Sequence, residues 1–168
     1  MILCGFPGIG KSFVAKNYNG FVDLESTPFK KNWDLYTDVA IHMNNNGYHV
    51  LMSSHKEVRD MLLSKNVGFS VILPLIEDKE IYMKRYKNRG NDEEFIKFLD
   101  ENYEKFITEI MDDKRLCALT LPTNRYLAWY LNRKLEVIYG ASNLKSACPF
   151  HAIYMGKPYE SEPDKKED

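Results

Sequence analysis

Short apolar runs and amphipathic stretches alternate along the first 133 residues of the chain. The apolar runs are bounded by glycine or polar residues, which is typical of buried strands, above all in parallel sheets. They fall at residues 1–4, 20–25, 48–53, 69–75 and 116–121. We therefore expect five strands separated by other elements.

The stretches between these runs carry apolar residues at helical spacing. They predict helices at residues 11–18, 33–46, 55–65, 79–89 and 123–133, and a longer helix whose apolar stripe runs from Ile96 to Ile110. Ser54 with Glu57, and Asn91 with Glu94, have the spacing of helix-capping boxes. Alternating strands and helices predict an α/β fold with a mostly parallel five-stranded sheet and helices on both of its faces.

The alternation fades after residue 133, so we expect one core domain over residues 1–133. Residues 134–159 are interpreted as a C-terminal extension packed on this core, with a possible edge strand at 135–139. Residues 160–168 are charged and lack apolar side chains, which is typical of a disordered tail.

Composition narrows the possible partners. The formal net charge is -1, and the pI near 6.4 does not favour nucleic-acid binding. No apolar run approaches the ~20 residues of a membrane span, and no secretory signal precedes the first strand. The three cysteines are widely spaced and odd in number, which argues against a disulfide framework or a cysteine-based zinc site. We expect a cytoplasmic protein without a membrane partner, and its oligomeric state stays open.

The strongest motif covers residues 5–12, GFPGIGKS, which match G-x-x-x-x-G-K-[ST] between a predicted strand and a predicted helix. Glycines let backbone N–H groups point at phosphate oxygens. Lys11 is expected to reach the β and γ phosphates, and Ser12 to offer its hydroxyl to Mg²⁺. The motif predicts that ATP and Mg²⁺ are the cofactors. The expected nucleotide contacts are Gly5, Pro7, Gly8, Ile9, Gly10, Lys11, Ser12 and Phe13.

Two acids, Asp23 and Glu25, follow at the end of the strand predicted for residues 20–25. Asp23-Leu24-Glu25 resembles the Asp-x-Asp motif of shikimate- and gluconate-type kinases. Asp23 is a candidate general base or Mg²⁺ ligand, and an ordinary loop acid is the alternative.

The resemblance extends over roughly residues 1–133. Besides the phosphate loop, residues 23–26, 32–33, 53–59 and 85–91 are similar to small nucleotide-kinase-like P-loop proteins often found in phages. It implies the three-layer P-loop NTPase sandwich with a short helical lid, and a nucleotide-kinase-like activity. The resemblance does not identify the acceptor of the phosphoryl group.

Arg85 and Arg89 lie one helical turn apart and are followed by Gly90. They resemble the Arg-x-x-x-Arg lid of nucleoside monophosphate kinases, which places a lid at about residues 79–95. Such arginines would offset the charge of the transferred phosphoryl group. A solvated helix face is the alternative.

Candidate acceptor contacts lie around the second and third predicted strands: Glu25, Phe29, Trp33, His55 and Arg59. The aromatic residues, with Tyr36, offer a stacking face for a base or else belong to the core.

The preferred function is ATP- and Mg²⁺-dependent phosphoryl transfer to a small acceptor, chiefly a nucleoside or deoxynucleoside monophosphate. A kinase of a non-nucleotide hydroxyl or a polynucleotide end, and a regulatory ATPase module, are the alternatives. The third predicted strand ends in Ser53 and not in the water-orienting acid of an ATPase switch, which favours the kinase.

Overall fold

The computed structural model describes residues 1–29 and 31–132. Within these ranges the strands form one sheet in which every pairing is parallel. In spatial order they are β2 (Phe21–Asp23), β3 (His49–Ser53), β1 (Ile2–Gly5), β4 (Phe69–Leu73) and β5 (Ala118–Thr120). The predicted α/β class and the five-stranded sheet are confirmed. Because the strands are parallel, their carboxyl ends share one edge of the sheet, where ligands of open α/β sheets bind.

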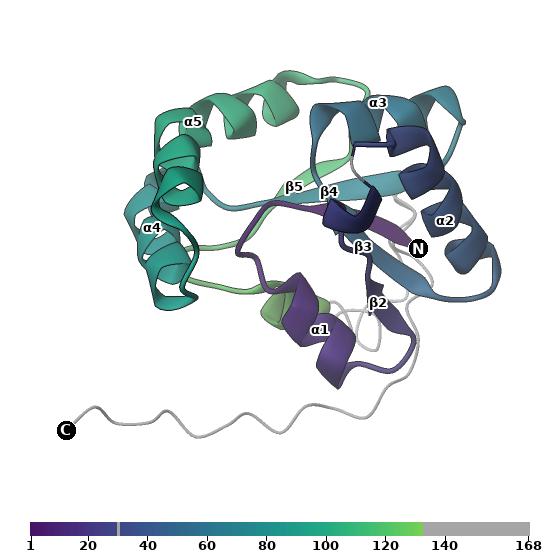
Figure 1. The fold of residues 1–168 in the computed structure, drawn as a ribbon, viewed down its shortest axis with the longest axis horizontal. Helices are drawn as coiled ribbons and strands as arrows, with labels where there is room; N and C mark the ends of the chain where they lie inside the picture. The colour runs from purple at the N-terminus through teal and green to yellow at the C-terminus, as the bar shows by residue number, and fades with distance from the viewer. Residues whose placement is uncertain (30, 133–168) are drawn as a thin grey trace, which may run out of the picture.

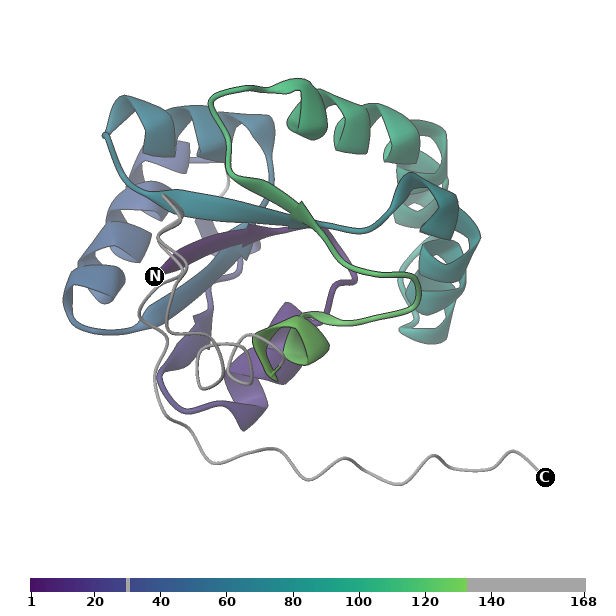
Figure 2. The same cartoon turned by 180° about the vertical axis from the view of Figure 1, so that it is seen from behind.

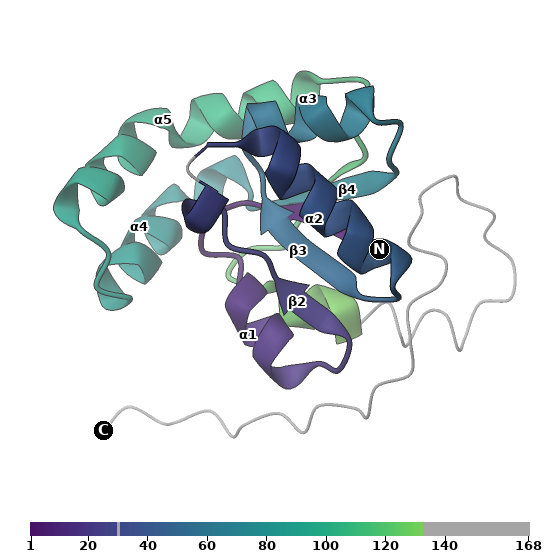
Figure 3. The same cartoon turned by 45° about the vertical axis from the view of Figure 1, so that its right-hand side comes forward.

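Helices cover both faces of the sheet (Figures 1 and 2). The α-helices are α1 (Lys11–Asn17), α2 (Trp33–Asn45), α3 (Lys56–Ser64), α4 (Lys79–Asn88) and α5 (Glu93–Asp112). Two short 3₁₀ helices are η1 (Thr27–Phe29) and η2 (Ile76–Asp78). A further helical segment begins at Leu127 and runs to the last described residue. Figure 3 shows α1 beside β2 on one side of the sheet and α2 beside β3 on the other.

The central strands form the core because both of their faces are covered. Leu3, Leu51 and Ile72, in three neighbouring strands, are fully buried. Burial of such apolar surface is the main stabilising contribution to the fold. In the described part of the chain, no helix is both long enough and apolar enough to span a membrane.

Two predicted helix caps are wrong. The residue at the N-cap of α3 is His55, no side chain caps the helix, and the Ser54 carbonyl instead accepts from the Arg59 side chain. The cap of α5 is Asp92, whose carboxylate accepts from the Phe95 N–H at 2.7 Å.

Asn91 belongs to the end of α4 and not to the start of α5. Its N–H donates to the Tyr86 carbonyl, and that of Gly90 donates to Lys87. Gly90 has a φ of 72°. Together these contacts form a Schellman motif, which uses the backbone of Asn91 to end α4. The helix predicted to start at residue 123 begins four residues later. The predicted extension and tail, residues 134–168, lie outside the described residues.

Candidate functional site

The glycine loop joins β1 to α1 at the carboxyl edge of the sheet. The Phe6 N–H donates to the Ile72 carbonyl of β4 at 3.0 Å, which holds the start of the loop against the sheet. The loop then turns back, with a 3.5 Å contact from the Ile9 N–H to the Phe6 carbonyl. Gly8 and Gly10 have φ values of 79° and 95°. Glycine adopts such values without strain, so the backbone path favours glycine at position 10, which the motif fixes, and at position 8, which the motif leaves variable.

Lys11 begins α1 and folds its side chain back across the loop. Its Nζ donates to the carbonyl of Gly5 at 2.9 Å and reaches that of Phe6 at 3.4 Å. Desolvation lowers the pKa of Lys11, and the negative charges of Asp23 and Glu25 oppose this shift. The site therefore holds a partly desolvated ammonium group beside two carboxylates. An anion that replaced the two carbonyl acceptors would meet a group already stripped of much of its water.

Ser12 and Asp23 come together from different elements. The Ser12 hydroxyl, in the first turn of α1, donates to a carboxylate oxygen of Asp23 at the end of β2 over 2.6 Å. In the described ranges, no group of three or more His, Cys, Asp or Glu residues is placed to hold a metal ion. One hydroxyl and one carboxylate nevertheless fit Mg²⁺, which takes oxygen ligands and keeps several of its waters.

Tyr36 ties the ends of β2 and β3 to each other. It is fully buried, its hydroxyl donates to the Leu24 carbonyl at 2.7 Å, and it accepts from the Ser53 N–H at 3.0 Å. Of the open alternatives for Tyr36, the structure supports the core. Phe29 and Trp33 are only half-buried and pack against it, with ring centroids at 5.0 and 6.1 Å. Part of each of these two residues therefore remains exposed.

His55 extends this aromatic group toward the loop. Its ring lies edge-on to Trp33, with centroids 5.2 Å apart. Desolvation lowers the pKa of His55, Glu57 opposes the shift, and positive charges, with Lys11 the first among them, lower the pKa further. Glu25 is exposed, and its charge acts on Lys11. The structure thus brings Glu25, Trp33 and His55 to the same edge of the sheet as the loop.

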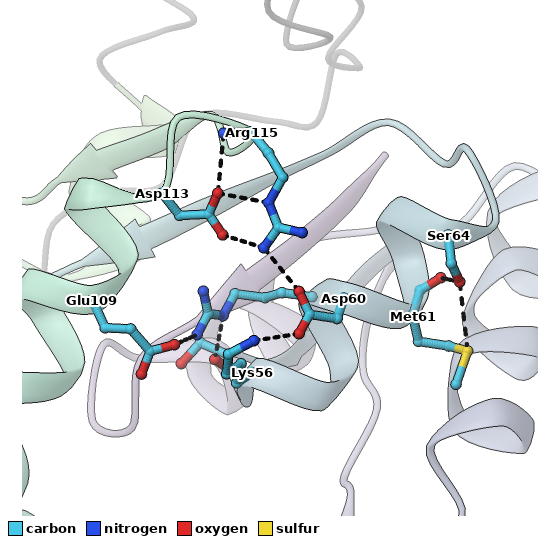
Figure 4. Close-up of polar contacts among 9 residues, drawn as sticks. Lys56, Asp60, Met61, Ser64, Glu109, Asp113 and Arg115 are labelled. Carbon is cyan, nitrogen blue, oxygen red and sulfur yellow. Dashed lines mark hydrogen bonds and ion pairs between the residues drawn. The ribbon is translucent and has the colours of Figure 1, made fainter.

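Arg59 points elsewhere. Its side chain is only 4% exposed, and it donates to a Glu109 carboxylate oxygen of α5 at 2.9 Å and to the Ser54 carbonyl at 3.1 Å. We expected it to contact a substrate phosphate, but these partners join α3 to α5. Figure 4 labels Glu109 and, near it, a more exposed group of ion pairs formed by Lys56, Asp60, Asp113 and Arg115.

The two lid arginines differ in environment. Arg85 is 8% exposed, and its guanidinium lies 4.5 Å from the Tyr82 ring centroid and 3.8 Å from that of Tyr126. It donates to the Asn124 side chain at 3.2 Å, and its Nη1 is buried without a partner among the described residues. Arg89 is exposed, and its charge lowers the pKa of Lys11. The solvated-face alternative is therefore wrong for Arg85.

Three tyrosines that surround the loop were not predicted. A Cβ added at Gly8 would lie 2.8 Å from the Tyr86 ring and 3.3 Å from that of Tyr82, and one added at Gly10 would lie 3.3 Å from Tyr126. The spacing of Tyr82 and Tyr86, four residues apart in a helix, indicates a shared face. The charged residues between and beside the two tyrosines make this shared face hard to recognise from the sequence alone. The position of Tyr126 has no local signal, because it depends on the chain's return to the loop after β5.

Comparison with known proteins does not assign the chain to a family. No protein-family model matches the sequence, and no curated protein matches it either. The chemistry of the site is therefore inferred from its own geometry. That geometry combines a glycine loop, a desolvated lysine, a hydroxyl–carboxylate pair and a half-buried aromatic surface at one sheet edge.

Proposed function

We propose that the chain is a P-loop phosphotransferase, which transfers the γ-phosphoryl group of ATP, in the presence of Mg²⁺, to a nucleoside or deoxynucleoside monophosphate. The observation that carries this proposal is the 2.6 Å contact between Ser12 and Asp23. The complete motif requires an oxygen from Ser12 for Mg²⁺, and the carboxylate at the end of β2 meets it there. The all-parallel sheet supports the P-loop NTPase fold as the framework.

The residues of the loop bind the donor. The backbone amides between Gly5 and Phe13 hold the phosphates, and the Lys11 ammonium exchanges its two carbonyl acceptors for the β and γ oxygens. Ser12 and Asp23 hold Mg²⁺ directly or through its waters, and the ion offsets charge on the β and γ phosphates when it is bound. The loop and its lysine thus orient the group that is transferred.

The acceptor binds beside the half-buried aromatic surface. Phe29 and Trp33 offer a stacking face, and His55 lies against Trp33. Arg89, which is exposed and acts electrostatically on Lys11, meets the charge that develops on the migrating phosphoryl group. Because a phosphate acceptor needs no general base, Asp23 then serves Mg²⁺ and orientation.

One screen tests the proposal. Purified protein is incubated with ATP, Mg²⁺ and a panel of nucleosides, nucleoside monophosphates, small hydroxyl compounds and oligonucleotide ends, and ADP is measured. The expected result is ADP formation that depends on a monophosphate. ADP formed only with a hydroxyl acceptor or an oligonucleotide end would overturn the choice of acceptor. The absence of both ATP binding and ADP formation would overturn the class.

A further inference from the structure

A tyrosine of α4 is bonded to the backbone of the glycine loop. Tyr86 is 1% exposed, and its hydroxyl donates to the Pro7 carbonyl at 2.9 Å. The edge of its ring fills the space at Gly8 where a Cβ would otherwise lie. Burial raises the pKa of Tyr86, so the phenol keeps its proton and remains a donor at any working pH. One buried side chain therefore contacts both residues of the Pro7–Gly8 peptide.

This peptide is the centre of a turn. Phe6 accepts from the Ile9 N–H, Pro7 stands at the second position, and Gly8 at the third has a φ of 79°. Proline followed by a glycine of positive φ is the pattern of a type II turn. Type I and type II turns differ mainly in the direction of their central peptide, and glycine permits both.

The hydrogen bond fixes that direction. In a trans peptide the C=O and N–H point to opposite sides, so a carbonyl held by Tyr86 turns the Gly8 N–H away from α4. A change to the type I form would reverse both groups and leave the phenol without its acceptor.

We infer that Tyr86 is a positioning residue, which holds the Pro7–Gly8 peptide so that the Gly8 N–H faces the bound phosphates. The inference rests on the proposed function, because it assumes a phosphate in the loop. It also links α4 to the loop: Arg89 lies about one helical turn beyond Tyr86. A shift of α4 that moves Arg89 therefore also acts on the peptide that binds the donor.

Tyr86→Phe tests this inference, and the chain offers a matched control. Tyr103 is also fully buried, and its ring packs edge-on against Phe6 of the loop with centroids 5.4 Å apart, but its hydroxyl donates outside the loop, to the Leu75 carbonyl at 3.0 Å. Both substitutions remove one oxygen that donates to a backbone carbonyl. We expect both to lower the melting temperature, because each leaves a carbonyl without its donor. Only Tyr86→Phe should weaken ATP binding, by about tenfold in calorimetry.

The outcomes separate a failure of the inference from a failure of the proposed function. Equal ATP affinity in wild type and Tyr86→Phe would overturn the inference and leave the proposed function intact. Equal loss in both variants would show that the effect is general destabilisation, which also overturns the inference. If the wild type itself does not bind ATP, the proposed function fails and the inference fails with it.

A measurement on the wild type keeps the test valid if Tyr86→Phe does not fold. The amide resonance of Gly8 is followed by NMR as ATP is added. We expect it to be among the most strongly shifted resonances of the chain, because its N–H gains a charged acceptor. A Gly8 resonance that stays in place at saturating ATP would overturn the inference.

Discussion

The Ser12 hydroxyl donates to the Asp23 carboxylate over 2.6 Å, which links the first turn of α1 to the end of β2. Asp23→Asn keeps the shape of the side chain and removes its charge. We expect kcat to fall by about 100-fold, and the Mg²⁺ concentration for half-maximal activity to rise, because the ion loses an anionic partner.

The control for Asp23→Asn is Asp38→Asn. Asp38 is an exposed carboxylate on α2 that pairs with Lys65. The measurement is a Mg²⁺ titration of steady-state ADP formation for both variants. Unchanged Mg²⁺ dependence in Asp23→Asn would remove Asp23 from the metal site.

Lys11→Ala is expected to abolish phosphoryl transfer without destabilising the fold. Desolvation disfavours the charged form of Lys11 in the folded chain, so loss of the charge removes that penalty along with two hydrogen bonds to carbonyls. Thermal melting should change little, whereas ADP formation should fall to background. Lys16→Ala, at an exposed position of the same helix, is the control and should retain activity. Turnover by Lys11→Ala would contradict the role of the loop.

The environments of Arg85 and Arg89 predict opposite consequences for their removal. Arg85→Ala removes a buried group packed between two rings and bonded to Asn124, so it should lower the free energy of unfolding by about 2 kcal/mol or more. Arg89 lies at the exposed end of α4, so Arg89→Ala should change the free energy of unfolding by less than about 0.5 kcal/mol. Its effect should appear in kcat, with little change in the KM for ATP.

Denaturant melts and steady-state kinetics on the two single variants separate these effects. Wild-type kcat in Arg89→Ala would exclude it from the transition state. A fully stable Arg85→Ala would mean that the two rings do not depend on its guanidinium.

The sequence predicted which functional residues follow each strand better than it predicted the environments of individual side chains. The glycine loop, its lysine and the acid after β2 are local motifs, and their positions follow from the ends of parallel strands. Arg59 and Arg85 are different. Both face side chains distant in sequence, Glu109 and Tyr126, and no local pattern shows that a charged helix residue faces inward. Burial of an arginine is decided by the partner that a distant segment supplies.

Arg59 and Glu109 allow that point to be tested. Glu109→Ala leaves a 4%-exposed guanidinium without its carboxylate and should destabilise the fold by about 2 kcal/mol or more. Arg59→Met removes the charge but keeps much of the side-chain volume, so it should destabilise the fold less than Glu109→Ala does. Asp60→Asn, in the more exposed pairs with Lys56 and Arg115, is the control and should stay within about 1 kcal/mol. Urea melts of the three variants give the comparison, and an equal cost for Glu109→Ala and Asp60→Asn would contradict it.

His55 predicts how stability depends on pH. Desolvation lowers its pKa from the ordinary value of 6.5, and Lys11 and other cations lower it further, so the unfolded chain binds its proton at a higher pH than the folded chain does. Between the two pKa values the unfolded state holds more protons, and the free energy of unfolding therefore rises with pH. The contribution of His55 is fully present above pH 6.5 and is lost as the pH falls through 6.5 toward the folded pKa. His49, whose pKa is lowered by desolvation and by the N-terminal charge, acts in the same direction.

His55→Gln and His49→Gln should each flatten this dependence, because glutamine does not titrate in the range. Melting temperatures measured at about pH 7.5 and about pH 5.5 should fall less in each variant than in the wild type. NMR titration of the wild-type rings gives the pKa values directly and separates the two histidines. A midpoint for His55 at or above 6.5 would contradict this prediction. A monophosphate acceptor bound beside His55 should raise that midpoint, because its negative charge favours the imidazolium, and the size of the increase would report how close the acceptor phosphate lies to the ring.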